Sequence, residues 1–335
     1  MKILVIRFSS IGDIVLTSPV VRCLKNQRPE TEIHYLTKAQ FGPILSGNPY
    51  IDRLHFLQPD LGALIGQLRQ ERFDQVIDLH HNLRSLRIAN GLSCPSHRFS
   101  KLNLDKWLMV RFKWNRLPDH SIVDRYFGTV RHLGVTNDGL GLDYFIPQDD
   151  QVAPEELPGS HRQGYIALVI GGAHPTKKMP REMLRELCRK LEEPVLLLGG
   201  AEDRGDGDFI READPSRIFN GCGNFRINQS ADLVAKSRLV ITHDTGLMHI
   251  AAAFKKQVIS IWGNTVPEFG MFPYYGNNSL LKLDPRSDLI EVRPLYCRPC
   301  SKIGYDKCPK GHFRCMRDID LNQIAEKAKA RLAKG

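Results

Sequence analysis

Two short segments carry polar side chains of the kind that perform group-transfer chemistry. Residues 9–13 form a turn that ends in Asp13, after the apolar run 3–7 and before a helical pattern. Residues 244–249 likewise follow an apolar run and lead into a helical pattern. Because open parallel sheets bind ligands at the carboxyl ends of their strands, the acid of the first turn can face the hydroxyl groups and backbone amides of the second. This combination is typical of a cleft that holds two substrates.

The elements around these turns predict two domains. The chain has 335 residues, more than the roughly 250–300 at which a single hydrophobic core stops growing. Residues 146–160 are acidic, contain three prolines and have no periodicity, so we interpret them as the domain linker. We expect an α/β protein in which residues 1–155 and 156–318 form two Rossmann-like domains facing across a cleft. A helix within 319–335 is expected to pack back toward the N-terminal domain.

Strand-like and helix-like segments alternate through both halves, and this alternation predicts parallel sheets with helices on both faces. Helices are predicted at 61–71, 83–90 and 121–133, with Ser121 as an N-cap, and at 321–332, with Asp318 or Asp320 as the cap. Strands are predicted at 3–7, 32–36, 53–57, 75–78 and 97–99, and then at 165–170, 195–198, 218–219, 239–242 and 258–261.

Composition narrows the class of protein. The net charge of +10 fits a solvated basic surface, an anionic membrane or an anionic substrate. No zinc finger, RNP-type motif or basic tail supports nucleic acid as a partner, and no G-x-G-x-x-G follows a strand, which leaves a nicotinamide or flavin site unsupported. The sequence shows no signal peptide and no apolar run long enough to span a membrane, so we expect a cytoplasmic protein.

Four motifs in register resemble glycosyltransferase family 9, the family of ADP-heptose:lipopolysaccharide heptosyltransferases. They are the opening turn, the Lys177-Lys178-Met179-Pro180 segment, the Asp244-Thr245-Gly246-Leu247-Met248-His249 turn, and Gly263-Asn264-Thr265. The similarity runs over nearly the whole chain. It implies the GT-B fold, with the acceptor on the N-terminal domain, the nucleotide-sugar on the C-terminal domain, and an inverting displacement.

Asp13 is the predicted catalytic residue. A carboxylate at this turn can take the proton of an acceptor hydroxyl as that hydroxyl attacks a sugar carbon, and the resemblance implies the same role. Ser10 and Gly12 would shape the turn on the acceptor side. The alternative interpretation is an aspartate that caps the helix beginning near Ile14.

The predicted donor site lies in the second half of the chain. Thr245 and Gly246 would open a helix whose free amides bind a diphosphate, where charge develops as the glycosidic bond breaks. The resemblance places Asp244 at the sugar hydroxyls or in ordering the loop, and His249 near the phosphates. The alternative is an ordinary helix cap followed by core residues.

Two further donor contacts are predicted from neighbouring loops. Thr176 and Lys177 can neutralise a departing diphosphate without a metal. The family pattern K-x-W-P has Met179 in place of Trp here, and we favour Lys177 over Lys178 as the phosphate ligand. Glu202, after Gly199-Gly200 at a strand end, is predicted to accept hydrogen bonds from ribose hydroxyls, although a glutamate in the first turn of a helix is an equally simple reading.

Basic residues mark the acceptor side. Arg84 follows a predicted strand and is suited to an anionic acceptor group. Residues 101–116 interleave bases, among them Lys106 and Arg111, with Trp107 and Trp114. This segment reads either as an amphipathic surface for an anionic membrane or as a plain amphipathic helix on the core.

Two motifs raise the question of a metal. We interpret Asp206-Gly207-Asp208 as a polar loop and not as a metal-binding D-x-D, and we expect the chemistry to need no metal or other cofactor. Cys297, Cys300, Cys308 and Cys315, with His312 between the last two, could close a structural zinc site. Reduced thiols in a tight lobe and disulfides are the alternatives.

These features predict an inverting, metal-independent glycosyltransferase that moves a heptose or related sugar from an ADP-sugar, ADP-heptose by resemblance, to an anionic lipid-linked core. We expect a monomer at the cytoplasmic face of the inner membrane, with no nucleic-acid partner. The alternatives are a nucleotide-sugar epimerase of the same fold and a non-catalytic nucleotide- or polyanion-binding protein.

Overall fold

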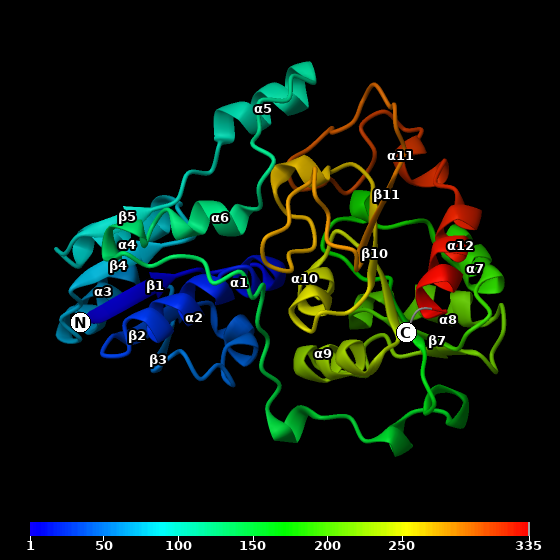
Figure 1. Cartoon of the computed structure of the whole chain (residues 1–335), viewed down its shortest axis with the longest axis horizontal. Coiled ribbons are helices and arrows are strands. Elements are labelled where there is room, and N and C mark those ends of the chain that lie inside the picture. Colours follow the sequence, from blue (N-terminus) through cyan, green and yellow to red (C-terminus); the bar gives the residue numbers. More distant parts are fainter. Residues whose placement is uncertain (334–335) are drawn as a thin grey trace.

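Two parallel β-sheets form the centres of two domains in the computed structural model, which describes residues 1–333 (Figure 1). The first sheet has the strand order β3-β2-β1-β4-β5, and every pairing in it is parallel. Its strands are β1 (Lys2–Ile6), β2 (Glu32–Thr37), β3 (Arg53–Phe56), β4 (Gln75–Asp78) and β5 (Ser96–Arg98).

The second sheet has the order β11-β10-β9-β6-β7-β8, again with parallel pairings. Its strands are β6 (Ile166–Val169), β7 (Val195–Leu198), β8 (Ile218–Asn220), β9 (Leu239–His243), β10 (Val258–Trp262) and β11 (Ser287–Glu291). In both sheets the strand order reverses beside the first strand of the domain. This switch point is where open parallel sheets bind ligands.

Helices cover both sheets. The first domain contains α1 (Ile11–Val15), α2 (Ser18–Gln27), α3 (Leu61–Gln70), α4 (Leu83–Gly91), α5 (Asn103–Phe112) and α6 (Ile122–Phe127). The second contains α7 (Arg181–Lys190), α8 (Arg204–Arg211), α9 (Ile227–Lys236), α10 (Gly246–Ala253), α11 (Arg314–Arg317) and α12 (Leu321–Leu332). Helix α5 projects away from the first sheet at the top of Figure 1. Within residues 1–333, none of the helices combines the length and the apolar character that a membrane crossing requires.

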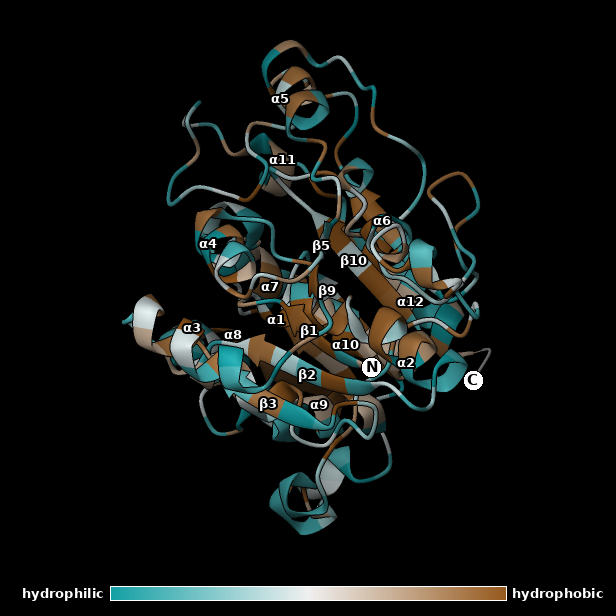
Figure 2. Cartoon of the chain, turned by 90° about the vertical axis from the view of Figure 1, so that its left-hand side faces the viewer, coloured by the Kyte–Doolittle hydropathy of each residue, from teal (hydrophilic) through white to brown (hydrophobic). Residues whose placement is uncertain are grey.

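The central strands are apolar on both faces. Residues 3–6 of β1 and residues 239–241 of β9 are fully buried, as expected where helices cover both sides of a parallel sheet. Figure 2 shows the apolar strands in the interior and more polar residues on the outer helices. The predicted α/β class with two parallel sheets is therefore confirmed.

The two domains meet at the turns 9–13 and 244–249, where helices α1 and α10 begin. Helix α1 packs against α10, as Figure 1 shows near its centre. A Cβ atom on Gly12 would lie 2.5 Å from Cδ2 of His249, and one on Gly246 would lie 2.7 Å from Cβ of Ile11. Both distances are too short for real side chains, so glycine at each position is what lets the two helix starts approach one another.

The predicted helix at 121–133 is shorter than expected. Ser121 does accept the amide of Val123 as the N-cap, but the α-helix ends at Phe127, before Gly128. A 3-10 turn, Arg131–Leu133, follows. Glycine costs about 1 kcal/mol relative to alanine inside a helix, which explains why the periodic pattern continues and the helix does not.

Strand β11 was not predicted, because it is an edge strand with charged residues. Asp288 lies within it and pairs with Lys327 and Arg331 of α12, at 2.8 and 2.7 Å. The polarity that hides this strand in the sequence is therefore explained by its ion pairs with a helix.

Helix α12 begins after Asp320, whose carboxylate accepts two backbone amides as the predicted cap. The expectation that this helix packs back toward the N-terminal domain is corrected by its contacts with α7, β9 and β10, and by its ion pairs with Asp288 on β11. Buried Ile324 and Ala328 join the apolar core of the second domain. The apolar residues of α12 predicted that the helix packs on a core, but the sequence did not reveal which domain provides that core. Residues 334 and 335 of the predicted segment lie outside the described residues.

The Asp206-Gly207-Asp208 segment lies inside α8 and not in a loop, so that prediction is corrected as well. Asp208 accepts a hydrogen bond from Nδ2 of Asn220 at 2.8 Å, and Asp206 pairs with Arg181 at 3.4 Å. Gly207 suits the helix because a Cβ atom there would meet the Asn220 side chain at 2.2 Å. Both carboxylates thus have protein partners.

Candidate active site

Asp13 stands at the start of α1 in a fixed orientation. Its Oδ1 pairs with Nη2 of Arg7 at 2.6 Å, and its Oδ2 accepts the Ser10 hydroxyl at 2.8 Å and the Ser10 amide at 3.1 Å. Arg7 is buried and also donates to the carbonyls of Ser9 and Leu79, at 2.8 and 2.6 Å. Helix α1 begins at Ile11 with Ser10 as its N-cap, and Asp13 is its third residue, so the alternative in which Asp13 caps a helix beginning near Ile14 is corrected. The catalytic role of Asp13 stays a prediction.

The surroundings keep Asp13 ionised. Burial alone would raise the pKa of its carboxyl group, but the Arg7 charge and the hydrogen bonds from Ser10 outweigh burial, and the net effect lowers the pKa. The carboxylate form is therefore the form present at neutral pH. A group in this state can accept a proton, which is the requirement for a general base.

Across the interface, the second turn is held by a short chain of polar contacts. Lys177 Nζ pairs with Oδ2 of Asp244 at 2.6 Å, and the Thr265 hydroxyl donates to the same oxygen at 2.9 Å. Thr245 is the N-cap residue of α10, and Gly246 is its first residue. The start of the eight-residue helix α10, with its unpaired amides, therefore lies beside a lysine, a combination that favours an anion.

His249 lies between the two turns. It is 1% exposed, and burial lowers its pKa to about 4, so the ring is neutral. Among residues 1–333, its Nδ1 has no hydrogen-bond partner, and the same holds for Nδ1 of His243 and both side-chain polar atoms of Asn264. Buried polar atoms are normally satisfied by protein, water or ligand. Water or a ligand can therefore satisfy these atoms beside Asp244.

The predicted donor contacts in the neighbouring loops differ in their environments. Thr176 is 3% exposed, and its hydroxyl donates to the carbonyl of Tyr305 at 2.9 Å while accepting the Tyr305 amide at 2.8 Å. This hydroxyl anchors the loop, and its proton is already used. Lys178 pairs with Asp203 at 2.5 Å, which leaves Lys177 as the lysine on the Asp244 side. Glu202 is exposed on the turn after β7, where its ribose role stays a prediction.

Positive groups gather on the acceptor side of Asp13. Lys106 is partly buried, and burial, reinforced by the charges of Arg125 and Lys302, lowers its pKa to about 7, against the influence of Asp13. Burial also lowers the pKa of Lys101, and the charge of Lys302 adds to this effect while that of Asp13 opposes it. Several positive groups thus lie on the acceptor side of Asp13, where Asp13 and Asp78 oppose the lowering of the Lys101 pKa.

The two arginines predicted on the acceptor side are placed differently. Arg84 is exposed on α4 and acts on His80, whose pKa is lowered to about 3 by burial together with the charges of Arg7, Lys101 and Arg84. Arg111 is exposed near the end of α5 and lies over the Phe112 ring, 5.7 Å from its centroid. The structure brings Lys106 toward Asp13 and gives Arg111 no comparable relation to it.

The four clustered cysteines form a lobe beside this site. All are free thiols, and Cys315 is buried. Cys297 Sγ lies 3.8 Å from Nε2 of His312. Burial, with the neighbouring thiols, raises the pKa of Cys315 to about 12. In the described residues the thiols are not paired as disulfides. Within residues 1–333, no three ligand atoms of this lobe lie within 4.8 Å of one another, and the zinc site stays a prediction.

The sequence did not reveal the role of several residues. Arg7 follows an apolar strand, and a single charge at that point is the one signal that could have singled it out. Thr265 belongs to a motif that was noted, but its bond to Asp244 depends on the approach of two loops. Lys302 comes from the cysteine lobe of the second domain and acts on the acceptor side of the first.

Comparison with known proteins decides the family. The sequence profile of glycosyltransferase family 9 (heptosyltransferase) matches residues 61–293, which is more than half of the chain. The chain belongs to glycosyltransferase family 9. This glycosyltransferase is 26% identical to lipooligosaccharide heptosyltransferase 2 of Haemophilus influenzae, over all of both chains.

Solved structures agree with the GT-B prediction. A family 9 glycosyltransferase from Veillonella parvula superposes with a TM-score of 0.78 at 22% identity, covering 100% of this chain and 98% of that one. An Escherichia coli heptosyltransferase solved with ADP gives a TM-score of 0.69 at 19% identity, covering 99% and 100%. The predicted fold, family and enzyme class are confirmed.

Proposed function

We propose that this glycosyltransferase moves a heptose from ADP-heptose to an anionic, lipid-linked lipopolysaccharide acceptor, with Asp13 as general base. The observation that carries the proposal is the ionised Asp13 carboxylate facing the start of α10 across the domain interface. The relatives support the substrates, because the Haemophilus influenzae protein is named a lipooligosaccharide heptosyltransferase and the Escherichia coli enzyme was solved with ADP.

The proposed step is a single displacement. The acceptor hydroxyl gives its proton to Asp13 while its oxygen forms a bond to the anomeric carbon on the face opposite the leaving group. The bond from that carbon to the diphosphate oxygen breaks, and the electron pair leaves with ADP. Lys177 and the first amides of α10 stabilise the developing charge, and the configuration at the anomeric carbon inverts.

The acceptor is proposed to be anionic because of the charge around Asp13. Lys101, Lys106 and Lys302 act on one another, and burial already lowers the pKa of Lys101 and Lys106. An acceptor phosphate or carboxylate would relieve this repulsion and favour the charged lysines. A neutral acceptor would leave the repulsion between these lysines in place.

Donor binding tests the second turn. We expect Lys177→Ala to weaken ADP binding by about ten-fold or more, because a lysine–phosphate contact is charge-assisted and worth roughly 1.5–3 kcal/mol. Calorimetry with ADP, UDP and GDP measures this, and ADP should bind best to the unchanged protein.

The matched control for Lys177 is Lys236→Ala. Lys236 also pairs with an aspartate, Asp232, at 2.6 Å, but it lies on α9 away from the turn. The Lys236→Ala variant should leave ADP binding unchanged. If no nucleoside diphosphate binds to the wild-type chain, the donor site is assigned wrongly and the transferase proposal fails with it.

We also propose that α5 and the cysteine lobe form a surface for an anionic membrane. Leu104, Trp107, Phe112 and Trp114 are between 50% and 66% exposed. Tyr296 and Ile303 of the lobe are 69% and 63% exposed. Lys113 joins the two parts by donating to the carbonyl of Pro299 at 2.7 Å. Exposed aromatic groups among basic residues are suited to a membrane interface.

Vesicle binding tests this surface. The double variant Trp107→Ala/Trp114→Ala should lower partitioning onto vesicles containing anionic lipid by about thirty-fold or more, because each ring removes apolar burial worth more than roughly 1 kcal/mol. Leu140→Ala is the control, since Leu140 is 63% exposed on a different segment. Equal partitioning of the double variant and the wild type would contradict the proposal.

A further inference from the structure

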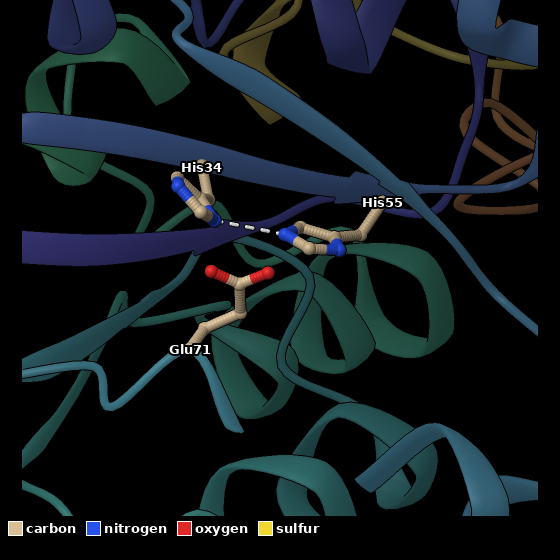
Figure 3. A group of neighbouring side chains, drawn as sticks. All are labelled: His34, His55 and Glu71. Carbon is tan, nitrogen blue, oxygen red and sulfur yellow. Dashed lines mark hydrogen bonds between the residues drawn. The ribbon is translucent and has the colours of Figure 1, made fainter. Parts of the chain in front are cut away.

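A second cluster of polar side chains lies on the first domain, away from the active site. His34, His55 and Glu71 each offer one ligand-type atom, and these atoms all lie within 4.8 Å of one another (Figure 3). His34 is fully buried, and the other two are partly buried. His34 is the third residue of β2, whereas Asp13 follows the carboxyl end of the neighbouring strand β1. The cluster is therefore not part of the transfer site.

The fold itself brings the three side chains together. Strands β2 and β3 are parallel, with Leu36 opposite His55 and His34 opposite Arg53. Because side chains alternate along a strand, His34 and His55 emerge on the same face of the sheet. Glu71 is the C-cap residue of α3, which covers that face. Figure 3 shows the Glu71 carboxylate pointing toward the space between the two rings.

A further carboxylate orients the buried ring. Nε2 of His34 lies 2.7 Å from Oε1 of Glu32, and Nδ1 of His34 lies 2.8 Å from Nε2 of His55. With the Nε2 proton directed at Glu32, the Nδ1 of His34 presents its lone pair toward His55 and Glu71. A carboxylate behind a histidine is the usual arrangement that fixes the tautomer of a metal-ligating ring.

We propose that His34 Nδ1, His55 Nε2 and a Glu71 carboxylate oxygen form a site for a divalent transition-metal ion of the zinc type. Two imidazoles and one carboxylate are a common ligand set for such ions, with water completing the shell. The ion replaces the proton between the rings, so the His55 proton moves to its Nδ1. Zinc–nitrogen bonds of about 2.0–2.1 Å require the two nitrogens to separate by roughly 0.5 Å.

The ion would tie an edge of the sheet together. It would join β2, the edge strand β3 and the end of α3 through one centre. Lys2 and Arg53 compete with the ion for the Glu71 carboxylate, because they pair with it at 3.3 and 2.6 Å. Binding therefore requires Glu71 to turn from these cations or to share its two oxygens between them and the metal.

Metal titration of the full chain tests the site. Co²⁺ is the probe, because its visible bands report bound ions and the charge-transfer absorption of thiolate ligands separates ions held by the cysteine lobe. We expect about one equivalent of Co²⁺ without thiolate absorption, displaced by Zn²⁺. His55→Ala and Glu71→Gln should each weaken this class by at least ten-fold.

Controls separate a metal site from a folding effect. His97→Ala removes a histidine of the same domain that stacks on His132, 3.6 Å between ring centroids, and should leave binding unchanged. Thermal unfolding in EDTA should be similar for wild type and Glu71→Gln, which decides the matter if His55→Ala fails to fold. The absence of a thiolate-free class in the wild type, or its persistence in a folded Glu71→Gln variant, would overturn the proposal.

Discussion

Replacing Asp13 with Asn is expected to lower kcat by roughly 10²–10⁴-fold, the usual contribution of a general base, while ADP binding stays within about two-fold. The amide has nearly the same shape as the carboxylate and can still accept the Ser10 hydroxyl with its oxygen. It cannot take a proton from the acceptor. The Arg7 guanidinium, held at 2.6 Å from the wild-type carboxylate, keeps its three other protein contacts.

Transfer of sugar from ADP-heptose to a lipopolysaccharide acceptor gives kcat, and calorimetry gives the ADP affinity. Asp149→Asn, a change of an exposed acid in the linker, is the control and should behave as wild type. A variant that retains more than about a tenth of wild-type kcat would show that Asp13 has only a structural role in the first turn of α1. Conversion of the nucleotide-sugar without acceptor by the wild type would favour an epimerase.

Most of the fold is readable from local patterns in the sequence. The strands at 75–78 and 195–198 have the predicted ends, because each contains adjacent β-branched or leucine residues next to a turn signal. The pattern failed where tertiary contacts decide the outcome. Strand β11 carries Asp288, which is partly exposed and pairs with Arg331 of α12, and Gly128 ends a helix whose apolar period continues.

The candidate site also combines residues that local sequence patterns predict with contacts that depend on the tertiary structure. Asp13, Lys177, Asp244 and His249 were marked by their positions after strands, which is a local signal. The contacts that tune them are not local, because Arg7 reaches Asp13 only after α1 folds back, and Thr265 reaches Asp244 from another loop. Thr176 shows the same limit, since the sequence showed a hydroxyl near a lysine but not the Tyr305 carbonyl to which it donates, and its donor contact stays a prediction.

Arg7→Met is expected to destabilise the protein by roughly 3–5 kcal/mol at neutral pH, the typical cost of removing one partner from a buried ion pair. The Arg7 side chain is 9% exposed and that of Asp13 is 21% exposed, so little solvent screens the pair. The variant also removes donors to the carbonyls of Ser9 and Leu79. Urea denaturation at neutral pH measures the loss, and Arg7→Lys, which keeps the charge with fewer donors, should lose less.

The same substitution should change how stability and activity depend on pH. In the wild type the folded-state pKa of Asp13 lies below its ordinary value of 3.8, so its contribution to stability is present above that value and is lost as the pH falls through the folded pKa. Without Arg7, the hydrogen bonds from Ser10 remain but the opposite charge is gone, so the folded pKa of Asp13 rises relative to the wild type. The Asp13 contribution to stability above that pKa then becomes smaller. The acid limb of the kcat–pH profile should move to higher pH, because the base is protonated there. Profiles of wild type and Arg7→Met that coincide would mean that Arg7 does not govern the proton affinity of Asp13.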